Sequence, residues 1–110
     1  MTVERRERIR ALNDQLRRFH TGGRIMITKG VVAEGEAFLT NALLLIAAFD
    51  DFSEANDPYG ERDFGALTVG RERLFWKIDY YDPSLTCAAV DPAQSDGCVR
   101  VLTVMKAEEY

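Results

Sequence analysis

The sequence predicts an α+β fold, with two helices packed on one face of a mainly antiparallel sheet of about four strands. Two observations predict it: helical periodicity is concentrated in the first half of the chain, and strand-like segments gather in the second half. With 110 residues, of which 46% are hydrophobic, the chain is long enough to bury one core. We therefore expect a single domain over residues 1–110.

The first expected element is a helix over residues 2–21, capped by Thr2 and ended by Gly22-Gly23. An apolar stripe at helical spacing, expected to face the core, consists of Ile9, Leu12, Leu16 and Phe19. A polar stripe about a quarter-turn away consists of Arg6, Arg10, Asn13 and Arg17. Because Glu7 and Asp14 lie within reach of these arginines, we expect the polar stripe to be a solvated, salt-bridged face.

A short strand over residues 24–28 follows, and Gly30 is expected to end it. A second helix is predicted over residues 34–49, with Glu34 and Glu36 near its positive end. Residues 42–49 are apolar nearly all round, which predicts that this helix is the most buried element of the fold.

Acidic and aromatic side chains alternate in the segment between the second helix and the later strands. Six acids fall within residues 50–63, and only Arg62 offsets them. Asp57-Pro58-Tyr59-Gly60 fits a type I turn, in which Pro58 presets the backbone and holds Tyr59 at a fixed point.

Residues 64–69 and 73–81 predict two antiparallel strands joined by a turn at Gly70-Arg71. In that register Leu67 faces Leu74, and Gly65 faces Trp76, so that the indole can lie over bare backbone. Residues 82–97 predict a loop and residues 99–105 a last strand.

Charge is divided unevenly along the chain. Residues 1–29 hold eight Lys/Arg and three acids, a net charge of +5, whereas residues 30–110 hold six basic and fifteen acidic residues, a net charge of −9. The acidic body disfavours direct nucleic-acid binding, because phosphates would meet like charge. It favours a protein partner with a basic surface.

We expect this partner to bind an acidic, aromatic-bearing surface. Its candidate residues share a carboxylate or a phenol in or near the acidic segment; they are Asp50, Asp51, Glu54, Asp57, Tyr59, Glu61, Asp63, Asp79, Tyr80, Tyr81 and Asp82. No catalytic residue, metal or cofactor is assigned, since no phosphate-binding loop, Cys-x-x-Cys or His-Glu-x-x-His motif occurs. The single histidine, His20, suits the negative end of the first helix.

Two alternatives from other functional classes stay open, and so does a homodimer. One is a metal-assisted hydrolase that uses the carboxylates of Asp57, Glu61, Asp63 and Asp79. The other is an accessory regulator that binds DNA through the arginines of the first helix, Arg6, Arg10 and Arg17.

The protein is expected to be cytoplasmic and not to associate with a membrane. Its N-terminus is charged where a signal peptide would be apolar, and the apolar run at residues 42–49 is too short to span a bilayer. Cys87 and Cys98 are therefore expected to be reduced thiols, and the alternative, a disulfide that closes the loop holding both, stays open.

Two blocks, NDPYGE at residues 56–61 and FWKIDYYD at residues 75–82, resemble the domain-of-unknown-function family 3768. The opening segment, residues 8–28, and the closing segment, residues 100–110, are similar to the same family. The resemblance implies a small proteobacterial protein, often carried by plasmids and integrative elements. In that setting, we expect a non-enzymatic accessory protein that inhibits a host defence complex, as an anti-CRISPR or anti-restriction protein does.

Overall fold

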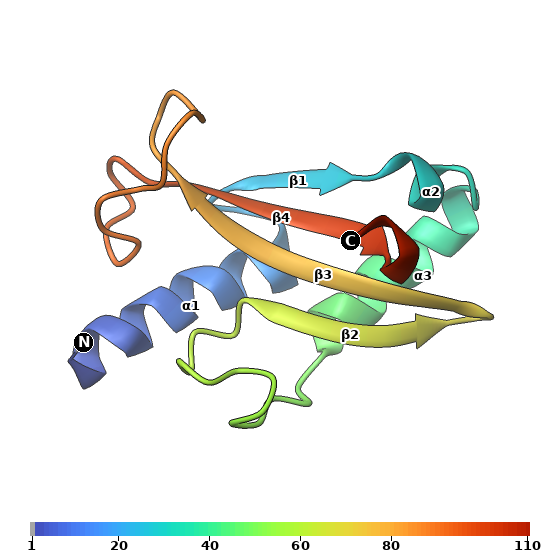
Figure 1. Ribbon diagram of the computed structural model, residues 1–110, viewed down its shortest axis with the longest axis horizontal. Coiled ribbons are helices and arrows are strands. Elements are labelled where there is room, and N and C mark those ends of the chain that lie inside the picture. The colour runs from blue at the N-terminus through green and yellow to red at the C-terminus, as the bar shows by residue number, and fades with distance from the viewer. Residues whose placement is uncertain (1) are drawn as a thin grey trace.

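The structure, a computed structural model, describes residues 2–110 (Figure 1). Its elements, in chain order, are α1 (Val3–Phe19), β1 (Arg24–Ile27), α2 (Lys29–Val32), α3 (Glu36–Ala48), β2 (Phe64–Val69), β3 (Glu72–Tyr81), β4 (Val99–Lys106) and the 3-10 helix η1 (Ala107–Glu109). The four strands form one sheet in the order β1-β4-β3-β2. The pairs β2–β3 and β3–β4 are antiparallel, and β1 joins β4 in parallel.

Helices α1 and α3 pack on one face of this sheet, and in Figure 1 they lie behind it. The core between the two layers contains Leu16 of α1, Ile46 of α3, Trp76 of β3 and Leu102 of β4, all of them 0% exposed. The predicted α+β class is therefore confirmed, with a sheet that is mixed because of the parallel β1–β4 pair.

The predicted hairpin register is confirmed: Leu67 pairs with Leu74 and Gly65 pairs with Trp76. A Cβ atom at Gly65 would lie 2.3 Å from Nε1 of Trp76, so only a glycine leaves room for the buried indole. The turn uses Gly70 with a φ of 60°, a left-handed conformation that glycine adopts without steric cost.

Helix α1 begins as predicted, because the Thr2 hydroxyl accepts a hydrogen bond from the Arg5 amide at 3.1 Å. It ends at Phe19, earlier than predicted, and His20 takes the left-handed conformation after it. Phe19 is 72% exposed, so its assignment to the buried stripe was wrong. The buried arc of α1 is centred between Leu16 and Asn13, and at about 100° per residue Phe19 points roughly a quarter-turn away from it.

The region expected to be one helix over residues 34–49 contains α3 alone, preceded by the four-residue α2. Gly35, with a φ of 97°, separates the two helices. The expectation that this helix is the most buried element was wrong: only Ala42 and Ile46 of α3 are fully buried, and Leu44 is 65% exposed. In a fold of two layers, α3 has one neighbour layer and leaves its other face to solvent.

The loop between β3 and β4 also packs against α1. Arg5 forms an ion pair with Asp91 at 2.7 Å, and Arg8 donates to the Ala93 carbonyl at 2.6 Å. Cys87 and Cys98 in this loop are free thiols. None of the helices within residues 2–110 has the length and apolar composition needed to cross a membrane.

Candidate functional site

The acidic loop, residues 50–63, connects α3 to β2 and is held in shape by its own hydrogen bonds. Asn56 donates to the Asp51 carbonyl and accepts from the Ser53 amide, both at 2.7 Å. The Gly60 amide donates to the Asp57 carbonyl at 3.1 Å, as the predicted turn at residues 57–60 requires. Tyr59, between them, is 71% exposed.

The polar stripe of α1 holds this loop against the body. Arg10 donates to the Gly60 carbonyl at 2.8 Å, and Asn13 donates to the Glu61 carbonyl at 3.0 Å. Asn13 is 0% exposed, so the expectation of a solvated helix face was wrong for this residue. Buried carbonyls need donors, and the stripe supplies them from a helix that is already fixed by its apolar neighbours.

Arg17 is also 0% exposed, which corrects the same expectation. Its guanidinium donates to the carbonyls at the end of α3, at 2.8 Å to Ile46 and 2.9 Å to Phe49. It lies 5.4 Å from the centroid of the Trp76 ring. Burial lowers the pKa of Arg17, which its ion pair with Asp14 partly offsets. A cation at the negative end of α3 stabilises that helix and fixes the start of the acidic loop.

The acids of the loop keep their negative charge unpaired. Arg62, the only basic residue in the loop, is held by Asp14 of α1 at 2.9 Å. Within residues 2–110, no ion pair involves the loop carboxylates, which are those of Asp50, Asp51, Glu54, Asp57, Glu61 and Asp63. Asp50, Asp51 and Glu54 are exposed, so the outer part of the loop presents this charge to solvent.

The inner end of the loop is tied to a buried polar network. The Tyr80 hydroxyl donates to Glu61 Oε1 and accepts from Asn13 Nδ2, both at 2.8 Å. Arg100, which is 2% exposed, donates to Asn13 Oδ1 at 2.9 Å and stacks on the Tyr80 ring. Burial raises the pKa of Tyr80. Tyr80 therefore positions Glu61 from beneath.

Asp63 lies at the end of the loop, directly before β2. Burial, together with the nearby charges of Glu61, Asp57 and Asp79, raises its pKa to about 6. The structure thus brings Asp57, Glu61 and Asp63 into one field of like charge, at the inner end of the acidic loop.

Three other candidate residues lie outside this loop. Asp79 is paired with Lys77 at 2.8 Å on the sheet face that the helices leave open. Asp82 accepts hydrogen bonds from Ser84 at 2.7 Å and from the Cys87 amide at 3.3 Å, which shape the β3–β4 loop. Tyr81 is on the open sheet face with Asp79. In the described part of the chain, no group of three or more His, Cys, Asp or Glu residues is arranged to hold a metal ion.

The family of the chain follows from comparison with known proteins. A family model described as "Protein of unknown function (DUF3768)" matches residues 27–109. The chain belongs to this family. No curated protein and no solved structure matches it.

The DUF3768 match contains the acidic loop and the whole hairpin, including both blocks that carried the resemblance. The match begins at Ile27, the last residue of β1, so α1 lies outside it. Of residues 8–28, for which similarity to the family was expected, the match includes only residues 27–28. The acidic loop of the family segment is thus held by side chains from a helix outside the matched region.

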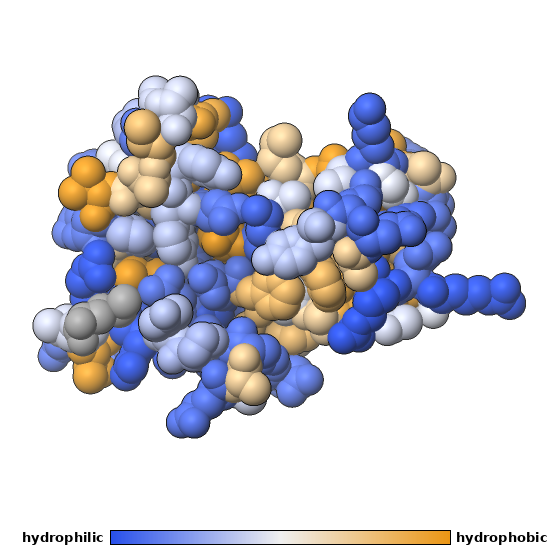
Figure 2. Space-filling model, viewed as in Figure 1, coloured by the Kyte–Doolittle hydropathy of each residue, from blue (hydrophilic) through white to orange (hydrophobic). Residues whose placement is uncertain are grey.

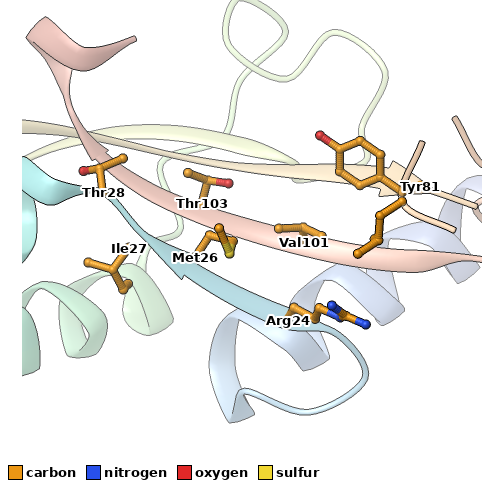
Figure 3. Close-up of a pocket in the computed structure, with 8 residues that line it drawn as sticks. Arg24, Met26, Ile27, Thr28, Tyr81, Val101 and Thr103 are labelled. Carbon is orange, nitrogen blue, oxygen red and sulfur yellow. The ribbon is translucent and has the colours of Figure 1, made fainter. Parts of the chain in front are cut away.

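A second feature, a groove on the open face of the sheet, was not predicted. It has a volume of about 360 Å³ and is lined by Arg24, Met26, Ile27, Thr28, Tyr81, Leu85, Val101 and Thr103 (Figure 3). We call it the open-face groove. Figure 2 shows that this side of the molecule mixes hydrophobic and hydrophilic surface. Alternation along β1 and β4 places Arg24, Met26, Val101 and Thr103 on this face, but the sequence did not show that this part of the face would be left open.

Proposed function

We propose that the protein is a non-enzymatic binding protein that uses its acidic loop to recognise a basic surface on a protein partner. The observation that carries the proposal is the absence, within residues 2–110, of any ion pair to the six loop carboxylates, although arginines lie nearby. Arg10 and Arg17 of α1 are engaged with carbonyls, and Arg62 is engaged with Asp14, so these cations do not neutralise the loop carboxylates, whose charge is left for a partner.

The loop also has the rigidity that recognition needs. Asn56 and the turn at residues 57–60 hold the backbone, and α1 clamps both ends of the loop. A loop that is ordered before binding loses less conformational entropy on association. Tyr59 projects from the turn with 71% of its surface exposed, and it supplies a rigid aromatic contact beside the carboxylates.

We propose further that the partner is a host defence complex that normally binds nucleic acid, and that the protein inhibits it in an anti-CRISPR or anti-restriction role. The Lys/Arg groups of a nucleic-acid groove are already arranged for negative charge, and a carboxylate-bearing loop can occupy such a groove. The arginines named for the alternative of DNA binding support it less well, since Arg17 is fully buried and Arg10 is bonded to the Gly60 carbonyl.

The test is capture of the partner from host lysate with tagged protein, using two variants that each lose three negative charges. The loop variant is Asp50→Asn, Asp51→Asn, Glu54→Gln. The matched control, Glu7→Gln, Asp96→Asn, Glu108→Gln, changes exposed acids outside the loop. We expect wild type and control to capture the same nucleic-acid-binding protein and the loop variant to lose it. The proposal is overturned if wild type captures no such protein, or if both variants capture it equally.

A second measurement addresses the mechanism of inhibition. Added duplex DNA or RNA should compete with the protein for the captured partner, because both would occupy the same basic groove. Binding should also weaken as salt increases, since exposed charges are screened at high ionic strength. A complex that forms equally well with nucleic acid bound would rule out occupation of the groove.

A further inference from the structure

The open-face groove lies at the edge of the sheet opposite the acidic loop, since β1 is one edge strand and the loop leads into β2 at the other. Its floor is Val101 and Thr103 of β4, and β1 lines one side with Arg24 and Met26 (Figure 3). Tyr81 of β3 lies on the other side, and Leu85 of the β3–β4 loop also lines the groove. A volume of about 360 Å³ is within the range of small-molecule sites.

Apolar side chains line the middle of the groove and are open to solvent. Met26 is 55% exposed and Leu85 is 38% exposed, while Val101 beneath them is 8% exposed. Covering such side chains with an apolar ligand removes them from water, which is favourable in proportion to the apolar area buried.

The charge of the groove comes from one residue. Arg24 is the only charged residue in the lining, and within residues 2–110 its guanidinium makes no hydrogen bond or ion pair. Lys77 and Asp79, which pair with Thr103 and Val101 of the floor, neutralise each other at 2.8 Å. The groove therefore offers a single positive charge to a ligand.

The two ends of the groove differ in sign. Figure 3 shows Arg24 and Tyr81 at one end, on either side of Val101, and Thr28 at the other end. The Thr28 hydroxyl donates to the Glu109 carboxylate at 2.7 Å, so negative charge stands at that end. In Figure 3 the Tyr81 hydroxyl points away from the Arg24 guanidinium, so Arg24 alone supplies the charged contact at that end.

We propose that the open-face groove binds a small organic monocarboxylate with an apolar body. The carboxylate would lie against the Arg24 guanidinium, with the apolar body over Met26, Val101 and Leu85. Charge complementarity selects the anion, because Arg24 attracts it and Glu109 repels it from the far end. Arg24, as the one cation in the lining, neutralises the single charge of a carboxylate, whereas a phosphate dianion would keep an uncompensated charge.

The test uses three probes that share one body and differ in charge: phenylbutyrate, phenylbutanamide and phenylbutylamine. Each is titrated into the full chain labelled with ¹⁵N, and amide shifts are followed by NMR. We expect phenylbutyrate to shift β1, β4 and Leu85 in a saturable manner, the neutral amide to bind about five- to tenfold more weakly, and the amine not to bind.

Two variants separate the charge contact from a general effect on structure. Arg24→Gln should weaken phenylbutyrate binding about five- to tenfold and leave phenylbutanamide binding unchanged, because only the charged hydrogen bond is lost. Arg71→Gln, which removes an exposed arginine from the β2–β3 turn, should leave both affinities unchanged. Unchanged amide spectra away from the groove verify that each variant is folded.

The outcomes are distinguishable. Equal binding of the three probes, or no saturable shift with phenylbutyrate, overturns the proposal. Shifts confined to the second cavity, which Arg18, His20 and Leu44 line between α1 and α3, would place the anion elsewhere and also overturn it. Because the groove and the acidic loop lie at opposite edges of the sheet, loss of partner capture by the loop variant leaves this test unaffected.

Discussion

Gly65 gives the sharpest test of how the core is packed. Its strand position pairs with Trp76, which is 0% exposed. A Cβ at Gly65 would lie 2.3 Å from Nε1, 2.6 Å from Cε2 and 2.9 Å from Cζ2 of the indole. These distances are far inside van der Waals contact, so Gly65→Ala requires either the indole or the β2 backbone to move.

The indole has little room to move. The rings of Phe49 and Phe52 pack edge-on against it, with centroids at 5.6 Å and 6.1 Å, and Arg17 lies over it at 5.4 Å. Overpacking of a filled core costs about 1–3 kcal/mol. We expect Gly65→Ala to lower the free energy of unfolding by about this amount, measured by urea denaturation followed by tryptophan fluorescence and, independently, by circular dichroism.

A double-mutant cycle identifies the cause. Trp76→Phe removes the part of the indole that the new methyl group would meet, although it also leaves a cavity. In the Trp76→Phe background, Gly65→Ala should cost less than about 0.5 kcal/mol, because the methyl group enters vacated space and the unfolded chain loses entropy. Equal costs in the two backgrounds, or no cost in the wild type, would refute the reasoning.

The remaining predictions concern the polar interface of α1 and the inner end of the acidic loop. Arg17→Met leaves the buried carbonyls at the end of α3 without a donor and should lower the free energy of unfolding, measured by urea denaturation, by about 3 kcal/mol. The control Arg18→Met, at an exposed site, should lower it by less than about 0.5 kcal/mol. Similar losses in the two variants would contradict the role of Arg17 as the donor to these carbonyls. The pKa of Asp63 is raised from 3.8 to about 6 in the folded protein, so the stability that its protonated form contributes is present below about pH 4 and is lost as pH rises through about 6. Asp63→Asn should therefore raise the free energy of unfolding at neutral pH by up to about 2 kcal/mol, after allowance for solvent screening, and the gain should vanish in denaturation at about pH 4. Tyr80→Phe removes the hydrogen bond to Glu61 and should cost about 1–2 kcal/mol, with faster amide exchange in the acidic loop than in β3; unchanged exchange would show that Tyr80 does not position the loop.

The sequence predicted the hairpin because its determinants are local. Gly70-Arg71 fixes the turn, the turn fixes the register, and the register places Gly65 opposite Trp76. The same holds for the Thr2 cap and for the turn at residues 57–60, where the signal and its hydrogen bond lie within a few residues.

The orientation of α1 depended on partners far away in the chain. Periodicity defined an apolar stripe and a polar stripe on α1. The rotation of the helix about its axis, however, depends on carbonyls of residues 46–61, which accept hydrogen bonds from Arg10, Asn13 and Arg17 and so draw the polar stripe inward. A stripe of arginines on a helix normally indicates exposure to solvent. Only the folded structure shows that backbone carbonyls lie close enough to accept hydrogen bonds from these arginines.

The sequence predicted only the part of the candidate site that depends on residues close together in the chain. The loop acids at residues 50–63 are neighbours in sequence and remain neighbours in space, whereas Tyr80 and Asp79 alternate along β3 and therefore point to opposite faces. The open-face groove depends on three strands and a loop, and no single segment carries a signal for it.

The interface of α1 has a consequence for synthesis. The helix is made before its partners elsewhere in the chain, which include the carbonyls of residues 46–61, Asp91, Ala93 and Arg100. Until residues 91–106 have left the ribosome, Arg5 and Arg8 lack the acceptors on Asp91 and Ala93, and the apolar side chains of α1 lack the sheet strand β4 that they cover. Docking of α1 is thus expected to be a late event in folding, and a nascent chain stalled before residue 100 should remain sensitive to protease.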